Sequence, residues 1–194
     1  TLAAACVRAA SLSPGQSVWD PFCGSGTLVI EALCLSRGLP AQDPEVMRAF
    51  QRWPSHDEEA YGLWTPPPAE PIPRNAWASD IDSEAVERCG RNAARAGVGD
   101  ACALLTGDFQ EIVEQIPQGV AVIGNLPYGK RVKMKAPRAT LGRLGDLLRT
   151  RKDLGPVLLL DAGGGVPGLT GLSWRSAVQF SNRGTPVTLW RLER

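Results

Sequence analysis

Short apolar segments alternate along the chain with longer segments in which apolar residues recur at helical spacing. We predict strands for the short segments, at 17–20, 75–80, 101–108, 120–125 and 156–162. We predict helices for the longer ones, at 2–10, 25–37, 83–97, 109–116 and 137–152. Apolar strands that alternate with helices are typical of a parallel sheet covered on both faces. The pattern therefore predicts an α/β fold.

Two regions depart from this alternation. Residues 173–182 and 185–194 are both strand-like, and Arg183 with Gly184 between them predicts a hairpin, so the sheet should finish with antiparallel strands. Residues 41–75 are charged and contain tryptophan up to about Trp64, and then contain TPPPAEPIPR, where proline prevents regular structure. We expect a helical excursion there, followed by a stiff loop.

The composition is that of one ordinary globular domain, which we expect to span residues 1–194. Apolar residues make up 43% of the chain and charged residues 21%, and no uninterrupted apolar stretch reaches membrane-spanning length. The five cysteines are scattered and never form a CxxC pair, which argues against a disulfide framework and against a zinc site. We expect no bound metal and a reducing compartment, the cytoplasm or an organelle.

Charge is distributed unevenly, although the net charge is only +1. The window 130–152 contains nine lysines and arginines and a single acid, Asp146. Such a cluster suits a polyanion, and it is equally typical of a solvated basic helix face. The sequence alone leaves both interpretations open.

The first stretch that indicates chemistry is DPFCGSGT, residues 20–27, where a predicted strand turns into a helix. Gly24 and Gly26 let the backbone approach a ligand, and the following helix offers unpaired N–H groups. A phosphate-binding P-loop would need a Gly-Lys-Ser/Thr ending, and a dinucleotide fingerprint would need glycine in place of Val29. If the stretch is more than a tight turn, a nucleoside without a pyrophosphate fits best, because Asp20 would repel phosphates and attract an amine.

Acids follow the next two predicted strands. Asp80 ends 75–80, where a carboxylate can accept two hydrogen bonds from a ribose diol, and Asp82 is expected to cap the following helix. Asp108 follows the next strand and could accept from an adenine amino group, while Phe109 could cover the adenine face. Helix capping is the alternative role for Asp80, and a plain turn is the alternative for Asp108.

GNLPYGK, residues 124–130, follows the apolar run VAVI. The Asn125 side-chain oxygen and the Leu126 carbonyl could both accept hydrogens from one planar amine. Pro127 would fix the turn, and the Tyr128 ring could stack on a base. Two acceptors in the plane of an exocyclic amine favour a geometry in which the amine nitrogen can act as a nucleophile. Reaction at such an amine therefore requires neither a covalent nucleophile nor a metal.

Four stretches, in this order and spacing, resemble class I S-adenosylmethionine-dependent methyltransferases: DPFCGSGTLVIEA, SDIDSEAVERCGRNAARAGV, GD and GNLPYGKR. More narrowly, they resemble the catalytic domain of the THUMP-associated RNA guanine-N2 methyltransferases that act on large-subunit rRNA or tRNA. FQRWPSHDEEAYGLW is similar to that group as well. The resemblance implies a Rossmann-like fold with a mostly parallel seven-stranded sheet, helices on both faces and a C-terminal antiparallel hairpin.

The resemblance also implies a cofactor, S-adenosyl-L-methionine, and a set of site residues. Asp20, Cys23, Gly24 and Gly26 would hold the methionine side, Asp80 the ribose, and Asp108 with Phe109 the adenine. The residues that would hold the target amine are Asn125, Leu126, Pro127 and Tyr128.

One residue departs from the usual motif, which is Asn-Pro-Pro-Tyr. Leu126 stands in its second place, and Asn-Leu-Pro-Tyr also occurs in rRNA adenine dimethyltransferases. Methylation of adenine N6 in RNA or DNA, or of a glutamine amide, therefore remains an alternative to guanine N2. A non-catalytic RNA-binding module that retains the fold is the alternative of a different class.

In the resembled family an RNA-binding domain usually precedes the helix with which this chain opens, so we expect such a domain in the full-length protein. The partner implied is structured RNA, either rRNA or tRNA. Within this chain the basic segment after GNLPYGK would contact the phosphates. The candidate RNA-binding residues are Lys130, Arg131, Lys133, Lys135 and Arg138.

Overall fold

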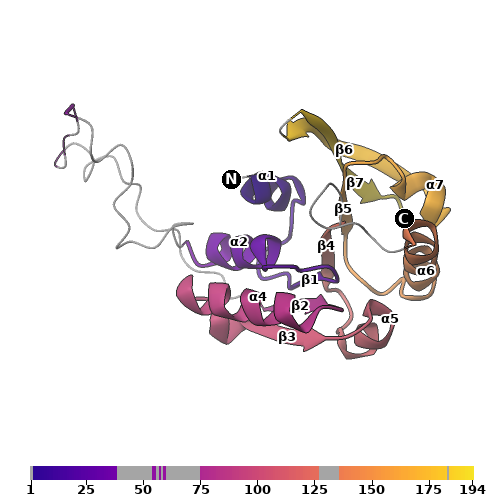
Figure 1. The fold of residues 1–194 in the computed structure, drawn as a ribbon, viewed down its shortest axis with the longest axis horizontal. Coiled ribbons are helices and arrows are strands. Elements are labelled where there is room, and N and C mark those ends of the chain that lie inside the picture. Colours follow the sequence, from indigo (N-terminus) through magenta and orange to yellow (C-terminus); the bar gives the residue numbers. More distant parts are fainter. Residues whose placement is uncertain are drawn as a thin grey trace.

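The structure, a computed structural model, describes residues 2–38, 54–55, 57, 59, 75–126, 136–182 and 184–194. Its strands are β1 (Val18–Asp20), β2 (Ala76–Asp80), β3 (Cys102–Thr106), β4 (Ala121–Asn125), β5 (Val157–Asp161), β6 (Trp174–Asn182) and β7 (Thr185–Leu192). Its α-helices are α1 (Leu2–Ala9), α2 (Thr27–Ser36), α4 (Ser83–Arg95), α5 (Phe109–Ile112), α6 (Pro137–Thr150) and α7 (Val166–Thr170), as Figure 1 shows. The excursion predicted for 41–75 lies almost wholly outside the described residues.

The strands form one sheet in the order β3-β2-β1-β4-β5-β7-β6. Strands β1 to β5 are mutually parallel, and β7 runs antiparallel to both β5 and β6. This arrangement confirms the predicted Rossmann-like fold with its C-terminal hairpin. The strand order reverses between β1 and β4, and ligands of open α/β sheets bind beyond the carboxyl ends of the strands at such a point.

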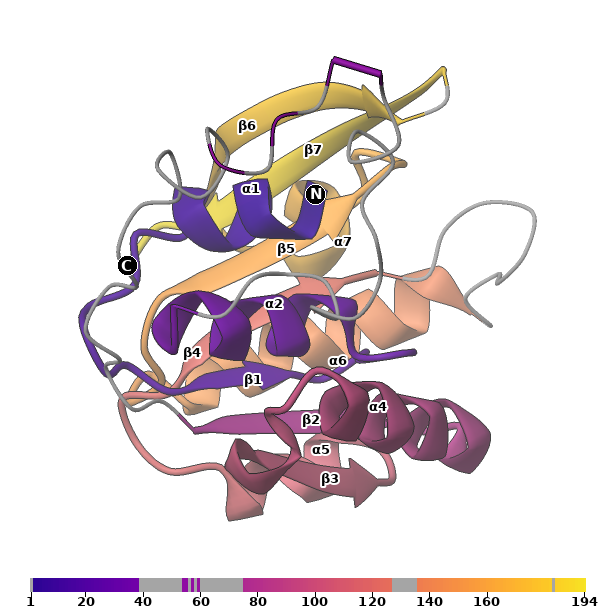
Figure 2. The same ribbon diagram turned by 90° about the vertical axis from the view of Figure 1, so that its left-hand side faces the viewer.

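Helices cover both faces of the sheet. Figure 2 shows α1, α2 and α4 on one face, with α5, α6 and α7 on the other. Side chains of the central strands alternate between the two faces, so Ile123 and Leu158 join the apolar cluster beneath α2, while Val122 and Leu159 join the cluster beneath α6. Burial on both faces explains why β4 and β5 are continuous apolar runs in the sequence.

Some predicted boundaries differ from the structure. The helix expected over 109–116 is α5 followed by a 3-10 turn, Val113–Gln115, so only its first part is α-helical. The segment expected as one strand over 101–108 begins with a 3-10 turn and contributes only Cys102–Thr106, at the edge of the sheet. Helix α7 was not predicted, because it is a single short turn that follows three glycines.

Helices α6 and α7 are in unusually close contact at one glycine. A Cβ added to Gly145 would overlap the backbone carbonyl oxygen of Thr170 and would lie 3.0 Å from that residue's Cα. By contrast, a Cβ added to Gly142, one turn earlier on α6, would meet no atom within 4 Å. The backbone of α7 therefore packs against α6 only because position 145 has no side chain.

Candidate active site at the carboxyl edge of the sheet

Asp20 ends β1 and lies at the strand-order reversal. Its side chain is only 1% exposed, and Oδ1 accepts a hydrogen bond of 3.0 Å from the Phe22 backbone N–H. Burial raises the pKa of this carboxyl well above its usual range, and the nearby Asp80 carboxylate raises it further. A cation placed beside Asp20 would relieve the cost of ionising it there.

The loop after β1 is fixed to β2 by its backbone. The Cys23 N–H donates to the Ser79 carbonyl at 2.9 Å, and the Gly24 N–H donates to Asp80 Oδ2 at 2.9 Å. Gly24 has φ +52° and Gly26, the N-cap of α2, has φ +86°, conformations that favour glycine. A Cβ on Gly26 would also overlap the Cys89 sulfur on α4. The local geometry therefore requires glycine at position 26 and favours it at position 24.

Cys23 takes part in this loop through its backbone. Its side chain is 6% exposed and interacts with the thiol of Cys89. That interaction, together with burial, raises the pKa of the Cys23 thiol, so the thiol stays protonated. The side chain belongs to the packing of the loop on α4.

Asp80 joins the loops that follow three strands. Its Oδ2 accepts from Gly24, its Oδ1 accepts from the Asp82 N–H at 3.1 Å, and its carbonyl accepts from the Gly107 N–H at 3.0 Å. Each carboxylate oxygen can accept more than one hydrogen bond, so each could also accept one from a diol hydroxyl. Asp82 caps α4 through the Glu84 N–H at 3.0 Å, which confirms the predicted cap.

Ile81 was missed in the sequence. This large apolar side chain lies between Asp80 and Asp82 and is 75% exposed, the most exposed of the large hydrophobic residues in the described part of the chain. A group bound beside Asp80 that covered this side chain would remove apolar surface from water, which is favourable. The sequence signal was an isoleucine placed between two acids directly after a strand.

Asp108 and Phe109 begin α5. Asp108 Oδ1 accepts from the Gln110 N–H at 2.9 Å and from Arg143 Nη2 at 2.7 Å. The Phe109 ring is 5% exposed, meets the Phe22 ring edge-on with centroids 5.5 Å apart, and lies beneath the Arg143 guanidinium, 5.3 Å from its Cζ. Phe109 thus packs mostly inside the protein, and its contact with the adenine face stays a prediction.

Asn125 ends β4 beside β1, and Leu126 follows it. Asn125 is exposed, whereas Leu126 is 3% exposed and its N–H donates to the Leu160 carbonyl at 3.0 Å. A Cβ added to Gly124 would lie 3.7 Å from Asp20 Oδ1, so the end of β4 lies directly against the buried carboxyl. Pro127 and Tyr128 lie outside the described residues.

Asp161, which ends β5, is a further acid at this edge that sequence reasoning did not single out. It is 8% exposed, and its two oxygens accept from the Gly163 N–H at 2.8 Å and the Val166 N–H at 3.2 Å. Both bonds shape the turn into α7, next to the end of β4. An acid after an apolar strand, as at Asp20, was the available signal.

The basic window is less free than its composition suggests. Arg138 is exposed on α6, but Arg149 on the same helix pairs with Asp146 at 2.7 Å and donates to the Thr170 carbonyl at 2.8 Å. The other predicted RNA-binding residues, Lys130, Arg131, Lys133 and Lys135, lie outside the described residues.

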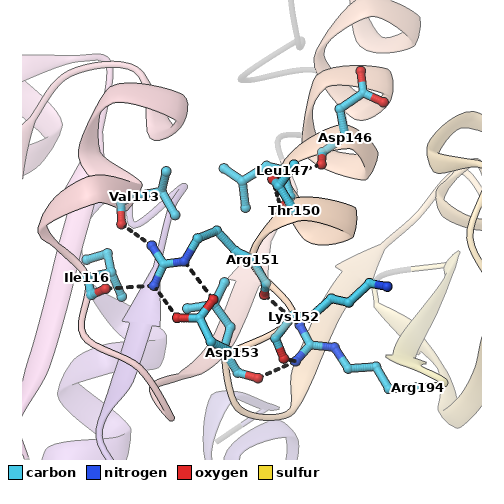
Figure 3. Close-up of polar contacts among 10 residues, drawn as sticks. Val113, Ile116, Asp146, Leu147, Thr150, Arg151, Lys152, Asp153 and Arg194 are labelled. Atoms are coloured by element: carbon cyan, nitrogen blue, oxygen red, sulfur yellow. Dashed lines mark hydrogen bonds and ion pairs between the residues drawn. The ribbon is translucent and has the colours of Figure 1, made fainter.

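Arg151, just after α6, is the most fully engaged of these cations (Figure 3). Its guanidinium forms a two-pronged ion pair with Asp153, at 2.8 and 2.9 Å, and donates to the carbonyls of Val113 and Ile116. The ion pair lowers the pKa of the Asp153 carboxyl. Arg194 donates to the carbonyls of Lys152 and Leu154 in the same region. These cations hold α6 to its neighbours.

Within the described residues, no group of three or more His, Cys, Asp and Glu is arranged to hold a metal ion. The same part of the chain has no helix with the length and apolar character needed to cross a membrane.

Comparison with known proteins identifies relatives over most of the chain. The family UPF0020, described as RMKL-like, methyltransferase domain, matches residues 1–144. SMU.472, crystallised with SAH (S-adenosylhomocysteine), superposes with a TM-score of 0.79 at 24% identity, over 100% of this chain and 52% of its own.

Two further solved structures share the fold. A predicted N6-adenine-specific DNA methylase from Listeria monocytogenes has a TM-score of 0.73 at 22% identity, over 97% of this chain and 50% of its own. TrmN from Thermus thermophilus has a TM-score of 0.64 at 22% identity, over 100% of this chain and 48% of its own. The chain thus spans about half the length of these proteins.

Proposed function

Because the chain belongs to the RMKL-like methyltransferase domain family, we propose that it transfers a methyl group to the exocyclic N2 amine of guanine in structured RNA, either rRNA or tRNA. S-adenosylmethionine is the cofactor of this family, as expected from the sequence. The observation that carries the proposal is the position of Asn125, which ends β4 directly after Gly124, where an added Cβ would lie 3.7 Å from Asp20 Oδ1.

The residues at the carboxyl edge fit the parts of this cofactor. Asp20 would face the cationic methionine amine, which would favour the ionised carboxylate that burial disfavours. Asp80 would accept from the ribose hydroxyls, and Ile81 would be covered by the adenine. Asp108 would accept from the adenine amino group through Oδ2, since Oδ1 already has two donors.

The target amine would donate its hydrogens to the Asn125 side-chain oxygen and the Leu126 carbonyl. The amine nitrogen would then attack the methyl carbon in line with the sulfonium. The N–C bond would form as the S–C bond breaks, S-adenosylhomocysteine would leave, and the methylated amine would lose one proton to water. The N–H of Leu126 is held by Leu160 and its side chain packs in the core beneath α6, so a leucine can hold this peptide in place. Positioning supplies most of the rate acceleration.

RNA is the substrate class that we favour. Arg138 is exposed on the helix that follows the candidate catalytic motif, with Lys130, Arg131, Lys133 and Lys135 between them in the sequence. TrmN, a tRNA methyltransferase, has a similar fold. Adenine N6 is the second candidate, favoured by Leu126 in the motif and by the Listeria protein.

The five cysteines are all free, which fits a cytoplasmic protein. An RNA-binding domain in the full-length protein would select the substrate.

The test is methyl transfer from tritiated S-adenosylmethionine to unmodified rRNA and tRNA, followed by mass spectrometry of the nucleosides. We expect N2-methylguanosine; N6-methyladenosine as the sole product would replace guanine by adenine. Asn125→Ala should lower turnover by roughly a hundredfold or more, by analogy with the loss of one preorganised polar group, and should leave SAH affinity within about twofold. Equal turnover in this variant and the wild type would contradict the assigned role.

A further inference from the structure

Arg143 reaches from α6 to the beginning of α5, where it contacts three consecutive residues. Its Nη2 donates to Asp108 Oδ1 at 2.7 Å, its Nε donates to Gln110 Oε1 at 2.7 Å, and its Cζ lies 5.3 Å from the centre of the Phe109 ring. A planar guanidinium provides such diverging donors and an aromatic contact at once, which a lysine does not.

These contacts determine which carboxylate oxygen of Asp108 is available. Oδ1 receives two donors, the Gln110 N–H at 2.9 Å and the Arg143 guanidinium. Within the described residues no hydrogen bond is formed by Oδ2. Because Oδ1 is held by two donors from different helices, rotation of the carboxylate is restricted. Oδ2 is then the oxygen that could accept a hydrogen bond from a ligand.

The same guanidinium holds Phe109 from above. The ring is fixed on another side by the edge-on contact with Phe22, which belongs to the loop after β1. Arg143 keeps 44% of its side chain exposed whereas Phe109 is 5% exposed, so the arginine is the more accessible of the two. Arg143 therefore joins the helix after the candidate catalytic motif to the adenine end of the inferred cofactor pocket, and through the Phe109 ring to the loop after β1.

We propose that Arg143 is a positioning residue for cofactor recognition: it orients the Asp108 carboxylate so that the protein distinguishes the 6-amino group of adenine. This inference rests on the proposed function, in which Asp108 faces the adenine. A 6-oxo base would place its carbonyl oxygen against the Asp108 oxygen, and the two acceptors would repel each other. Arg143 would thus act on specificity through Asp108, without contacting RNA.

The experiment compares the affinities of SAH and of its inosine analogue, S-inosylhomocysteine, by calorimetry. The wild type should prefer SAH by about tenfold or more, the effect of a hydrogen bond to a charged group. Arg143→Gln should reduce this preference to about threefold or less, Arg143→Lys should give an intermediate value, and Asp108→Asn should remove it. The control is Arg91→Gln, which disrupts only an exposed pair with Glu87 on α4 and should keep the wild-type preference.

The outcomes separate the inference from the function on which it rests. If the wild type binds neither compound, the proposed function fails and the inference with it. If the wild type prefers SAH and Arg143→Gln has the same ratio of the two affinities, the inference alone is wrong. This holds even where both affinities fall, because an equal ratio is what a purely structural arginine would give. Should Arg143→Gln be unfolded by circular dichroism, the ratio in Arg143→Lys decides in the same way.

Discussion

The contact between α6 and α7 yields two substitutions with identical chemistry and opposite expected signs. Gly142→Ala places a methyl group in open space on a helix, and the higher helix propensity of alanine should stabilise the fold by about 0.5–1 kcal/mol. Gly145→Ala gains the same propensity but drives its methyl group into the Thr170 carbonyl. Backbone cannot move aside as a flexible side chain can, so we take the upper end of the usual overpacking cost, about 3 kcal/mol.

The net expectation is a loss of about 2 kcal/mol for Gly145→Ala and a gain of up to about 1 kcal/mol for Gly142→Ala. The two variants should therefore differ by about 3 kcal/mol, which corresponds to roughly 6–12 °C in melting temperature for a chain of this size. Urea unfolding followed by circular dichroism measures both free energies. If Gly145→Ala is as stable as Gly142→Ala, the two helices are not packed backbone to backbone, and the fold around α7 has been described wrongly.

Three further predictions concern the carboxyl edge. The first is Asp20→Asn. In the folded wild type the raised pKa keeps the Asp20 carboxyl protonated at pH values where the unfolded chain has already lost this proton. The stability of the wild type therefore falls as pH rises from the usual carboxyl range through the raised pKa. The variant should escape this loss, and its advantage in urea unfolding should be small near pH 4 and grow towards pH 8; a constant difference would contradict the buried carboxyl. Ile81→Ala should weaken SAH binding, measured by calorimetry, by roughly 5- to 30-fold, since it removes about 1–2 kcal/mol of apolar burial. Its melting temperature should be unchanged because the side chain is 75% exposed. Equal SAH affinity in the variant and the wild type would show that adenine does not cover Ile81. Gly26→Ala should lose about 2–4 kcal/mol of stability through its positive φ and the overlap with Cys89, and adding Cys89→Ala should restore part of that loss; no recovery in the double variant would rule out the overlap.

Much of the site could be predicted because it depends on strand ends. In a parallel sheet the residues that follow successive strands meet at one edge, so Asp20, Asp80 and Asn125 could be brought together from the sequence alone. The same rule applied to Asp161, but its turn-forming role and α7 depend on hydrogen bonds within a glycine-rich loop that no periodicity reveals.

The contacts of Asp108 and Phe109 were not accessible in this way. Arg143 lies 35 residues after Asp108 in the sequence, and the two meet only because α6 returns across the sheet to pack beside α5. Nothing in the local pattern around Phe109 indicates that its ring is covered by a cation. The sequence shows the positive charge of the window 130–152. It does not show which acceptors bind each arginine, because those contacts depend on tertiary packing.

The arginines of α6 and its C-terminal end that are already paired within the chain affect how the proposed RNA binding should respond to salt. Protein cations that replace condensed counterions on nucleic acid give a dependence of log affinity on log salt of about 0.7–0.9 per phosphate contacted. Arg143, Arg149 and Arg151 each already form an ion pair within the chain, with Asp108, Asp146 and Asp153. They would displace few counterions, so the salt dependence of the proposed RNA binding should be shallower than the nine cations in this window would suggest.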